Sequence, residues 1–244
     1  MDSISATHRR QPAPLERWLR GLQVVSPPPF LLGGTGHLIL SPAEERRVAD
    51  ALRERILPQV LALAGARELR LLTGLAPGAD HVFTSVAAGW LQAHRHPYRV
   101  VGLLPLPVDV MLDDWAEKAR TQPDYSTTTH ERQRQRMQEE VDACDEIVHL
   151  LPPGTAPESL LSEPFRQLQY RRLAACLAEQ SDALIAILRD SSATQPGGTA
   201  EVVSWRREPQ RIPADVTTLP LRQRDPQRHL HLFVVAPDEA AHHG

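Results

Sequence analysis

The chain has 244 residues, of which 41% are apolar, and this is enough for one large domain with a substantial core. A net charge of −3 argues against a broad basic surface, so we do not expect nucleic acid as a partner. Cys144 and Cys176 lack the spacing of a metal site or disulfide, which fits a cytoplasmic protein. Because no apolar run approaches about 18 residues, we expect neither a membrane span nor secretion.

The ends of the chain differ in composition from its middle. Residues 1–28 are polar and run into three consecutive prolines, so we interpret them as an N-terminal tail. Within this tail, residues 15–25 could form a short helix that packs on the domain. Residues 29–206 are the predicted folded domain. Residues 207–244 are rich in proline, arginine and histidine, and we expect a loose C-terminal extension with one edge strand, His229–Val235.

Apolar runs alternate with helix-compatible stretches through the predicted domain. We expect strands over Phe30–Leu32, Arg67–Leu72, Tyr98–Leu104, Glu146–Leu151 and Ala183–Leu188. We expect helices after Ser41 and over Asp80–His94, Thr129–Ala143, Ser162–Gln180 and Thr199–Arg206. The alternation predicts an α/β fold with a mostly parallel sheet and helices on both faces.

Prolines affect the predicted structure of two segments, the helix after Ser41 and residues 105–126. Ser41 and Glu44 have the spacing of a capping box, which is typical of a helix start. Apolar residues then recur at every fourth position, which are Val48, Leu52, Ile56 and Val60. Pro58 is predicted to kink this helix. Residues 105–126 contain three prolines, so we expect an irregular segment with one possible short helix over Asp113–Arg120.

A first glycine-rich segment follows the first predicted strand. It contains four candidate ligand-binding residues, which are Gly34, Thr35, Gly36 and His37. The segment matches neither the GxGxxG fingerprint nor a P-loop, so a plain turn is an equal alternative. Its place at the carboxyl end of a strand favours a ligand, because open α/β sheets bind ligands there.

A second such segment runs from Thr73 to Asp80. Gly74 and Gly78 bracket the loop, and Asp80 lies at a predicted helix start. Asp80 could be a helix cap, or a carboxylate that binds ribose or takes part in catalysis. We favour the cap for Asp80 and a ligand-binding role for the loop backbone, with Thr73 supplying a hydroxyl.

The third segment, Pro196–Glu201, lies between a buried strand and a helix start. Gly197 and Gly198 have no Cβ, so the backbone N–H groups can approach an anion closely, and Thr199 adds a hydroxyl. Glu201 could be a general base or a ribose-binding carboxylate. It could equally be a first-turn carboxylate that the helix dipole stabilises.

Other polar and aromatic residues carry weaker signals. The chain has two His-x-His pairs, at positions 94 and 96 and at positions 229 and 231, but no cysteine or carboxylate cluster supports them. We therefore expect surface histidines, no metal site and no cofactor. Trp115 and Tyr125 could stack on a base or simply anchor the segment that contains them.

Together, the three glycine segments resemble those of a known superfamily. Thr73–Asp80 is similar to the SGxAxGxD loop of DprA/Smf proteins, and Pro196–Glu201 is similar to the PGG turn of LOG-like proteins. Both belong to the SLOG superfamily, and the resemblance covers roughly residues 30–206. It implies a Rossmann-like fold that binds a nucleotide through the glycine segments, and it suggests a homo-oligomer.

The resemblance implies three functions between which the sequence does not decide. We favour a sensor or accessory protein for a nucleotide-derived signal, such as an ADP-ribose-like molecule or a cyclic nucleotide, with bacterial antiviral defence as its setting. The alternative is a LOG-like nucleotide N-glycosidase with Glu201 and Asp80 as catalytic residues. The LOG pattern PGGxGTxxE would place its glutamate at position 204, where this chain has Ser204. The third is a non-catalytic scaffold or a DprA-like DNA-binding protein.

Overall fold

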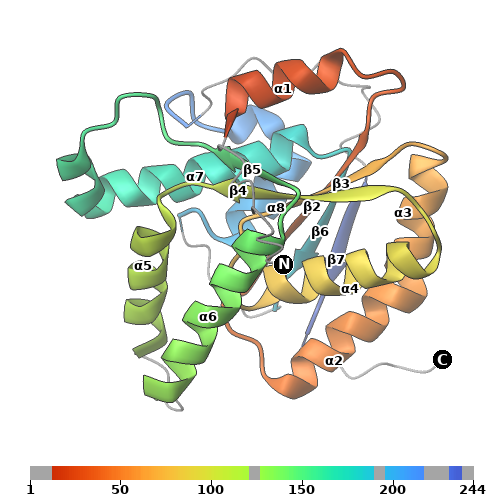
Figure 1. The fold of residues 1–244 in the computed structure, drawn as a ribbon, viewed down its shortest axis with the longest axis horizontal. Helices are drawn as coiled ribbons and strands as arrows, with labels where there is room; N and C mark the ends of the chain where they lie inside the picture. Colours follow the sequence, from red (N-terminus) through yellow and green to blue (C-terminus); the bar gives the residue numbers. More distant parts are fainter. Residues whose placement is uncertain (1–12, 121–126, 190–195, 217–230, 238–244) are drawn as a thin grey trace, which may run out of the picture.

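The computed structural model describes residues 13–120, 127–189, 196–216 and 231–237 (Figure 1). The predicted α/β class is confirmed, because the sheet is entirely parallel and helices flank it, as in Rossmann-like folds. The strands are β1 (Ala13–Pro14), β2 (Phe30–Gly36), β3 (Leu69–Thr73), β4 (Tyr98–Leu104), β5 (Glu146–His149), β6 (Ala183–Ile187) and β7 (Leu232–Val235). Their order in the sheet is β1-β5-β4-β3-β2-β6-β7.

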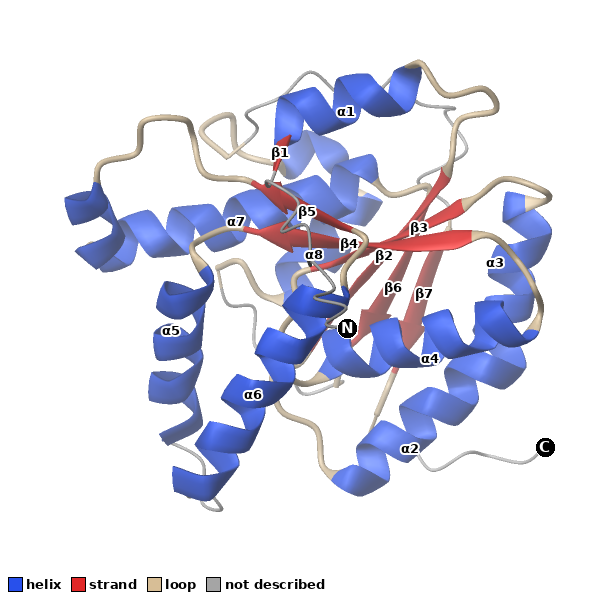
Figure 2. Cartoon of the chain, in the orientation of Figure 1, coloured by secondary structure: helices blue, strands red, loops and turns tan. Residues whose placement is uncertain are grey.

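Helices cover the sheet in two layers, and Figure 2 shows their arrangement. The helices are α1 (Leu15–Gln23), α2 (Pro42–Ala51), η1 (Leu52–Ile56), α3 (Leu57–Ala64), α4 (Ala79–Ala93), α5 (Val108–Arg120), α6 (Thr127–Ala143), η2 (Pro157–Leu161), α7 (Glu163–Gln180), α8 (Thr199–Arg207) and η3 (Pro209–Arg211). One apolar core joins β2, β3 and β6 to the layer formed by α2, η1, α3 and α4. A second core joins the opposite face to α1, α7 and α8, and a third joins α5 and α6 to the loops that follow β3 and β4.

The helix after Ser41 begins as its sequence predicts. Ser41 Oγ accepts a hydrogen bond from the Glu44 N–H at 3.3 Å, and the Glu44 carboxylate accepts from the Ser41 N–H at 2.7 Å, which completes the capping box. The helix then widens into the π-helical turn η1, one turn before Pro58. Proline has no N–H for the normal helical bond, so the distortion occurs where the kink was expected.

The first glycine segment is a strand and not the turn that its composition suggested. Gly33 to Gly36 continue β2 in register with β6, and Gly36 pairs with Ile187. A Cβ on Gly34 would lie 2.1 Å from the Phe83 ring, and one on Gly36 would lie 2.3 Å from the Cβ of Ala79. These glycines therefore let α4 pack closely on the central strand.

Segments near both ends of the chain take part in the fold. Residues 13–23 form β1 and α1, and the side chains of Leu15, Trp18 and Leu22 are buried. The expected edge strand near the C-terminus is present as β7, which pairs in parallel with β6. The irregular segment expected after β4 is largely the helix α5, which starts directly after Pro107. No helix in the described part of the chain is long and apolar enough to cross a bilayer.

The strand order creates a switch point between β2 and β6. From β2 the chain adds β3, β4 and β5 on one side, and it then crosses back to place β6 and β7 on the other side. The connections after β2 and β6 therefore leave the sheet in opposite directions. In open α/β sheets a ligand crevice forms at such a point, outside the carboxyl ends of the strands.

Candidate ligand-binding cleft

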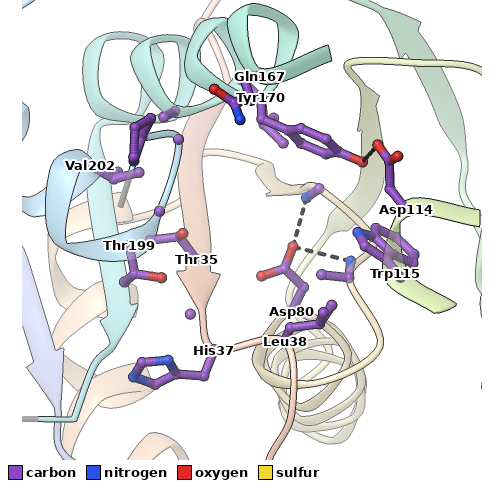
Figure 3. A pocket seen from close by; sticks show the side chains of 18 of the residues that line it. Thr35, His37, Leu38, Asp80, Asp114, Trp115, Gln167, Tyr170, Thr199 and Val202 are labelled. Atoms are coloured by element: carbon purple, nitrogen blue, oxygen red, sulfur yellow. Dashed lines mark hydrogen bonds between the residues drawn. The ribbon is translucent and has the colours of Figure 1, made fainter. Parts of the chain in front are cut away.

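A cleft of about 910 Å³ opens beside this switch point. Its walls come from the end of β2, the loop between β3 and α4, the helices α5 and α7, and the turn that leads into α8. Figure 3 shows Thr35 and Thr199 on one side, Asp114 and Trp115 on the other, and Asp80 between them. The volume falls within the range of about 300–1,000 Å³ that is typical of small-molecule sites.

The structure brings most of the sequence-predicted site residues to this cleft. Those that line it are Thr35, Gly36, His37, Gly74, Asp80, Gly197, Gly198 and Thr199. Those that do not line it are Gly34, Thr73, Gly78 and Glu201, which are placed by contacts elsewhere.

The start of α8 supplies unpaired hydrogen-bond donors to the cleft. Gly198 is the N-cap, and the N–H groups of Gly198, Thr199 and Ala200 have no acceptor among the described residues. All three residues line the cleft. The helix dipole adds partial positive charge at this end, so the turn is suited to an anion.

Two hydroxyl groups lie close to these amides. Thr35 and Thr199 are only 9% and 8% exposed, and both line the cleft. Within the described ranges, neither hydroxyl has a hydrogen-bond partner. Neither hydroxyl oxygen is fully shielded from solvent, so both are open to a polar ligand group beside the three unpaired amides.

Glu201, a candidate catalytic residue, does not line the cleft. Its Oε2 accepts a hydrogen bond from the Gly197 N–H at 2.6 Å. Its Oε1 lies 2.9 Å from Nη2 of Arg171 on α7. Glu201 therefore closes the glycine turn and joins it to α7, which is the first-turn role that the sequence left open.

Asp80 holds the second glycine loop. Its Oδ2 accepts hydrogen bonds from the N–H groups of Gly74 and Ala76, at 3.1 and 3.3 Å (Figure 3). The N-cap of α4 is Gly78, so Asp80 secures the preceding loop and does not cap its own helix. The loop amides expected to bind a ligand are therefore in part already used. The second oxygen of Asp80 remains on the cleft side of this arrangement.

Burial changes the acidity of Asp80. Desolvation raises its pKa to about 7, and the charge of Glu140 adds to this rise, while the hydrogen bonds from the Ala76 and Gly74 amides oppose it. Glu140 in turn pairs with His81 on the side of α4 that faces α6. A buried carboxyl that titrates near neutrality can donate as well as accept a hydrogen bond, so it can bind a ligand hydroxyl in either protonation state.

The other residues of the second glycine loop shape it from outside the cleft. Thr73 Oγ1 accepts a hydrogen bond from the Leu75 N–H at 3.1 Å, and Leu75 has a φ of 61°. A Cβ on Gly78 would lie 2.3 Å from the Leu38 carbonyl oxygen, so only glycine fits against the loop after β2. Thr73 and Gly78 therefore stabilise the conformation of the loop.

His37 connects the two strands at the switch point. Its Nε2 accepts a hydrogen bond from the Arg189 N–H, just after β6, at 3.0 Å. The Arg189 guanidinium in turn lies 2.7 Å from the carboxylate of Glu44 in α2. The imidazole ring lines the cleft while these contacts fix the loops on both sides of it.

The far wall of the cleft contains Trp115, which the sequence suggested as a stacking residue, and two residues of α7 that the sequence did not indicate, Arg166 and Tyr170. Arg166 Nε lies 2.9 Å from one oxygen of Asp114, and the Tyr170 hydroxyl donates to the other at 3.1 Å. Trp115 lines the cleft and also packs in the apolar core beside Met137, so it both faces the site and anchors α5. The contacts of Asp114 with Arg166 and Tyr170 connect α5 to α7, and no local pattern in the sequence indicates them. Tyr125 lies outside the described residues.

The histidine pairs do not form a metal site in the described part of the chain. His94 stacks on Trp90 with ring centroids 3.8 Å apart, and His96 Nε2 lies 2.9 Å from the Arg67 carbonyl oxygen. No group of three or more histidine, cysteine or acidic side chains among the described residues is arranged to hold a metal ion. His229 lies outside those residues.

Comparisons with family models, curated proteins and solved structures found no match to this chain. The chemistry that the cleft can support therefore follows from its own groups. Unpaired amides and hydroxyls lie at one end, a buried carboxyl near the middle, and an aromatic wall with an ion pair at the other end. This arrangement can bind a molecule that is anionic at one end and flat at the other.

Proposed function

We propose that the protein binds a nucleotide or a nucleotide-derived signal in this cleft. The observation that carries the proposal is the group of donors at the start of α8. Three backbone amides and the hydroxyls of Thr35 and Thr199 face one small region and have no partner among the described residues. A phosphate group offers several acceptor oxygens and negative charge, and it suits such a site at a helix N-terminus.

The rest of the cleft supports the remaining parts of such a ligand. Asp80 lies between the two ends, where its free oxygen can bind a ribose hydroxyl (Figure 3). Trp115 and Tyr170 give the far wall an aromatic character that suits a planar base. The resemblance to SLOG domains favours an ADP-ribose-like molecule or a cyclic nucleotide, and bacterial antiviral defence as the setting.

We favour a binding protein over an enzyme because of Glu201. An N-glycosidase that used this carboxylate would need it beside the scissile bond, but Glu201 does not line the cleft and its oxygens accept from the Gly197 N–H and from Arg171. Of the two candidate catalytic carboxylates, Asp80 and Glu201, only Asp80 lines the cleft. A homo-oligomer in the cytoplasm is a further proposal from the resemblance, and light scattering of the purified protein tests its oligomeric part.

A thermal-shift panel tests the proposed function. The purified protein is mixed with AMP, NAD, ADP-ribose and cyclic nucleotides, and each mixture is then separated by liquid chromatography. A ligand that binds the folded state raises the melting temperature by mass action. We expect at least one nucleotide to raise Tm and to be recovered intact. Release of free base would favour the N-glycosidase, and no shift with any compound would contradict nucleotide binding.

The variant Thr199→Val tests whether the nucleotide binds at the start of α8. Valine keeps the shape of the side chain and removes the hydroxyl. We therefore expect the affinity for the nucleotide to fall by roughly tenfold, which corresponds to one lost hydrogen bond to a charged group. Thr155→Val is the matched control, because the Thr155 hydroxyl donates only to the Pro152 carbonyl at 2.7 Å and lies away from the cleft. Equal ligand affinity of the Thr199 variant and the wild type would remove this hydroxyl from the site.

A further inference from the structure

Glu201 binds a different amide from the one expected of a residue in its position. In a capping box, the acidic residue three positions after the N-cap accepts from the N–H of the N-cap itself. Glu201 stands three positions after the N-cap Gly198, but its Oε2 accepts from the N–H of Gly197, at 2.6 Å. The Gly198 N–H therefore stays available on the wall of the cleft.

Arg171 accounts for this displacement. Its Nη2 lies 2.9 Å from Glu201 Oε1, and its Nε lies 3.3 Å from both carboxylate oxygens. The guanidinium carbon is also 5.4 Å from the centre of the Trp205 ring, which holds it against α8. Neither Arg171 nor Glu201 lines the cleft, so the ion pair draws the carboxylate to the outer side of the turn.

The turn itself rests on α7 at the same place. Gly197 has a φ of +73°, which glycine adopts freely. A Cβ at this position would lie 3.0 Å from the Cβ of Tyr170 and 3.2 Å from the backbone nitrogen of Arg171. Contact with α7 and the hydrogen bond to Glu201 therefore fix the residue that precedes the donors.

We propose that Arg171 and Glu201 form a positioning pair for the anion site at the start of α8. Arg171 holds the carboxylate outside the cleft, and the carboxylate in turn holds the Gly197 N–H, so the next three amides face the ligand. Without Arg171 the carboxylate is free to take the Gly198 N–H, as in an ordinary capping box. That change removes one donor and brings a negative charge to the site. The inference rests on the proposed function of the same cleft.

The test compares Arg171→Met with the double variant Arg171→Met, Glu201→Ala, which also removes the acceptor that would compete for the Gly198 N–H. AMP is the probe, and its affinity is measured by calorimetry. We expect Arg171→Met to lower the affinity by roughly tenfold or more, because an uncompensated charge now lies beside the phosphate. The double variant removes that charge, so affinity should return to within about threefold of the wild type. Arg53→Met is the matched control, since Arg53 forms only an exposed pair with Asp50.

Recovery of AMP affinity in the double variant distinguishes a positioning role of Arg171 from a role in stability alone. Both Arg171 variants lose the ion pair, so a purely structural role predicts the same low melting temperature and the same weak binding for both. Equal affinity of Arg171→Met and the wild type would overturn the proposal, and so would a double variant as weak as the single one.

Amide hydrogen exchange tests the pair without a ligand. In Arg171→Met we expect faster exchange at the Gly197 N–H and slower exchange at the Gly198 N–H, because the carboxylate moves from one to the other. Unchanged exchange at both amides overturns the positioning pair. If the wild type does not bind AMP, the AMP-based form of the proposed function fails, and this measurement still decides the pair.

Discussion

Two carboxylates perform the same structural task on opposite sides of the switch point. Asp80 and Glu201 each lie in the first turn of a helix and accept N–H groups from the glycine loop before it. The sequence placed both at helix starts but could not identify their partners. Arg171 is 30 positions from Glu201, and the hydrogen bonds depend on how α7 packs against α8. Asp80 differs in that it also faces the cleft.

The pKa of Asp80 leads to a prediction for stability against pH. Burial raises this pKa to about 7 from its ordinary value of 3.8, so between these values the folded state keeps a proton that the unfolded state loses. Asp80 therefore contributes stability below about pH 4 that is lost as the pH rises to about 7. Asp80→Asn has no such titration, and its Oδ1 can still accept from the loop amides.

Denaturant unfolding of both proteins from pH 4 to pH 8 measures this effect. Relative to Asp80→Asn, the wild type should lose on the order of a few kcal/mol of unfolding free energy across that range. A constant difference between the two proteins would show that Asp80 titrates normally and that the loop does not bury its charge.

At the scale of elements, close packing of α4 on β2 explains the first glycine segment. The sequence showed glycines after an apolar run, and composition alone does not distinguish a turn from a strand beneath a closely packed helix. The alternation of apolar runs and helical stretches located β2 to β6 and most helices. It missed the length of α5, because the prolines before Val108 suggested irregular structure, whereas they precede the helix.

Two alanine substitutions in this layer should have opposite effects. Gly34→Ala places a Cβ 2.1 Å from the Phe83 ring, so we expect a loss of about 1–3 kcal/mol in unfolding free energy, or more, from overpacking. Gly89→Ala lies in α4 with nothing within 4 Å of the new Cβ, so we expect a gain of about 0.5–1 kcal/mol from helix propensity. Chemical denaturation measures both, and a neutral Gly34→Ala would contradict the close contact between α4 and β2.

At the scale of the whole molecule, the strand order determines where the cleft lies. The sequence predicted a parallel sheet, but it gave no reason for β6 to dock beside β2 after the chain had moved away through β3, β4 and β5. That return brings the turn before α8 next to the end of β2, and it places Thr199 near Thr35. Most of the sequence-selected residues therefore do line the cleft, but their arrangement around one cleft depends on tertiary packing.

We propose that the first amides of α8 bind a phosphate group. Titration of the isotopically labelled protein with AMP, followed by amide nuclear magnetic resonance, observes each of these amides separately. We predict that the largest amide shifts occur at Gly198, Thr199 and Ala200, because these N–H groups have no acceptor in the described structure and gain one in the complex. Saturable shifts centred on other parts of the molecule, or no shifts at millimolar AMP, would contradict it.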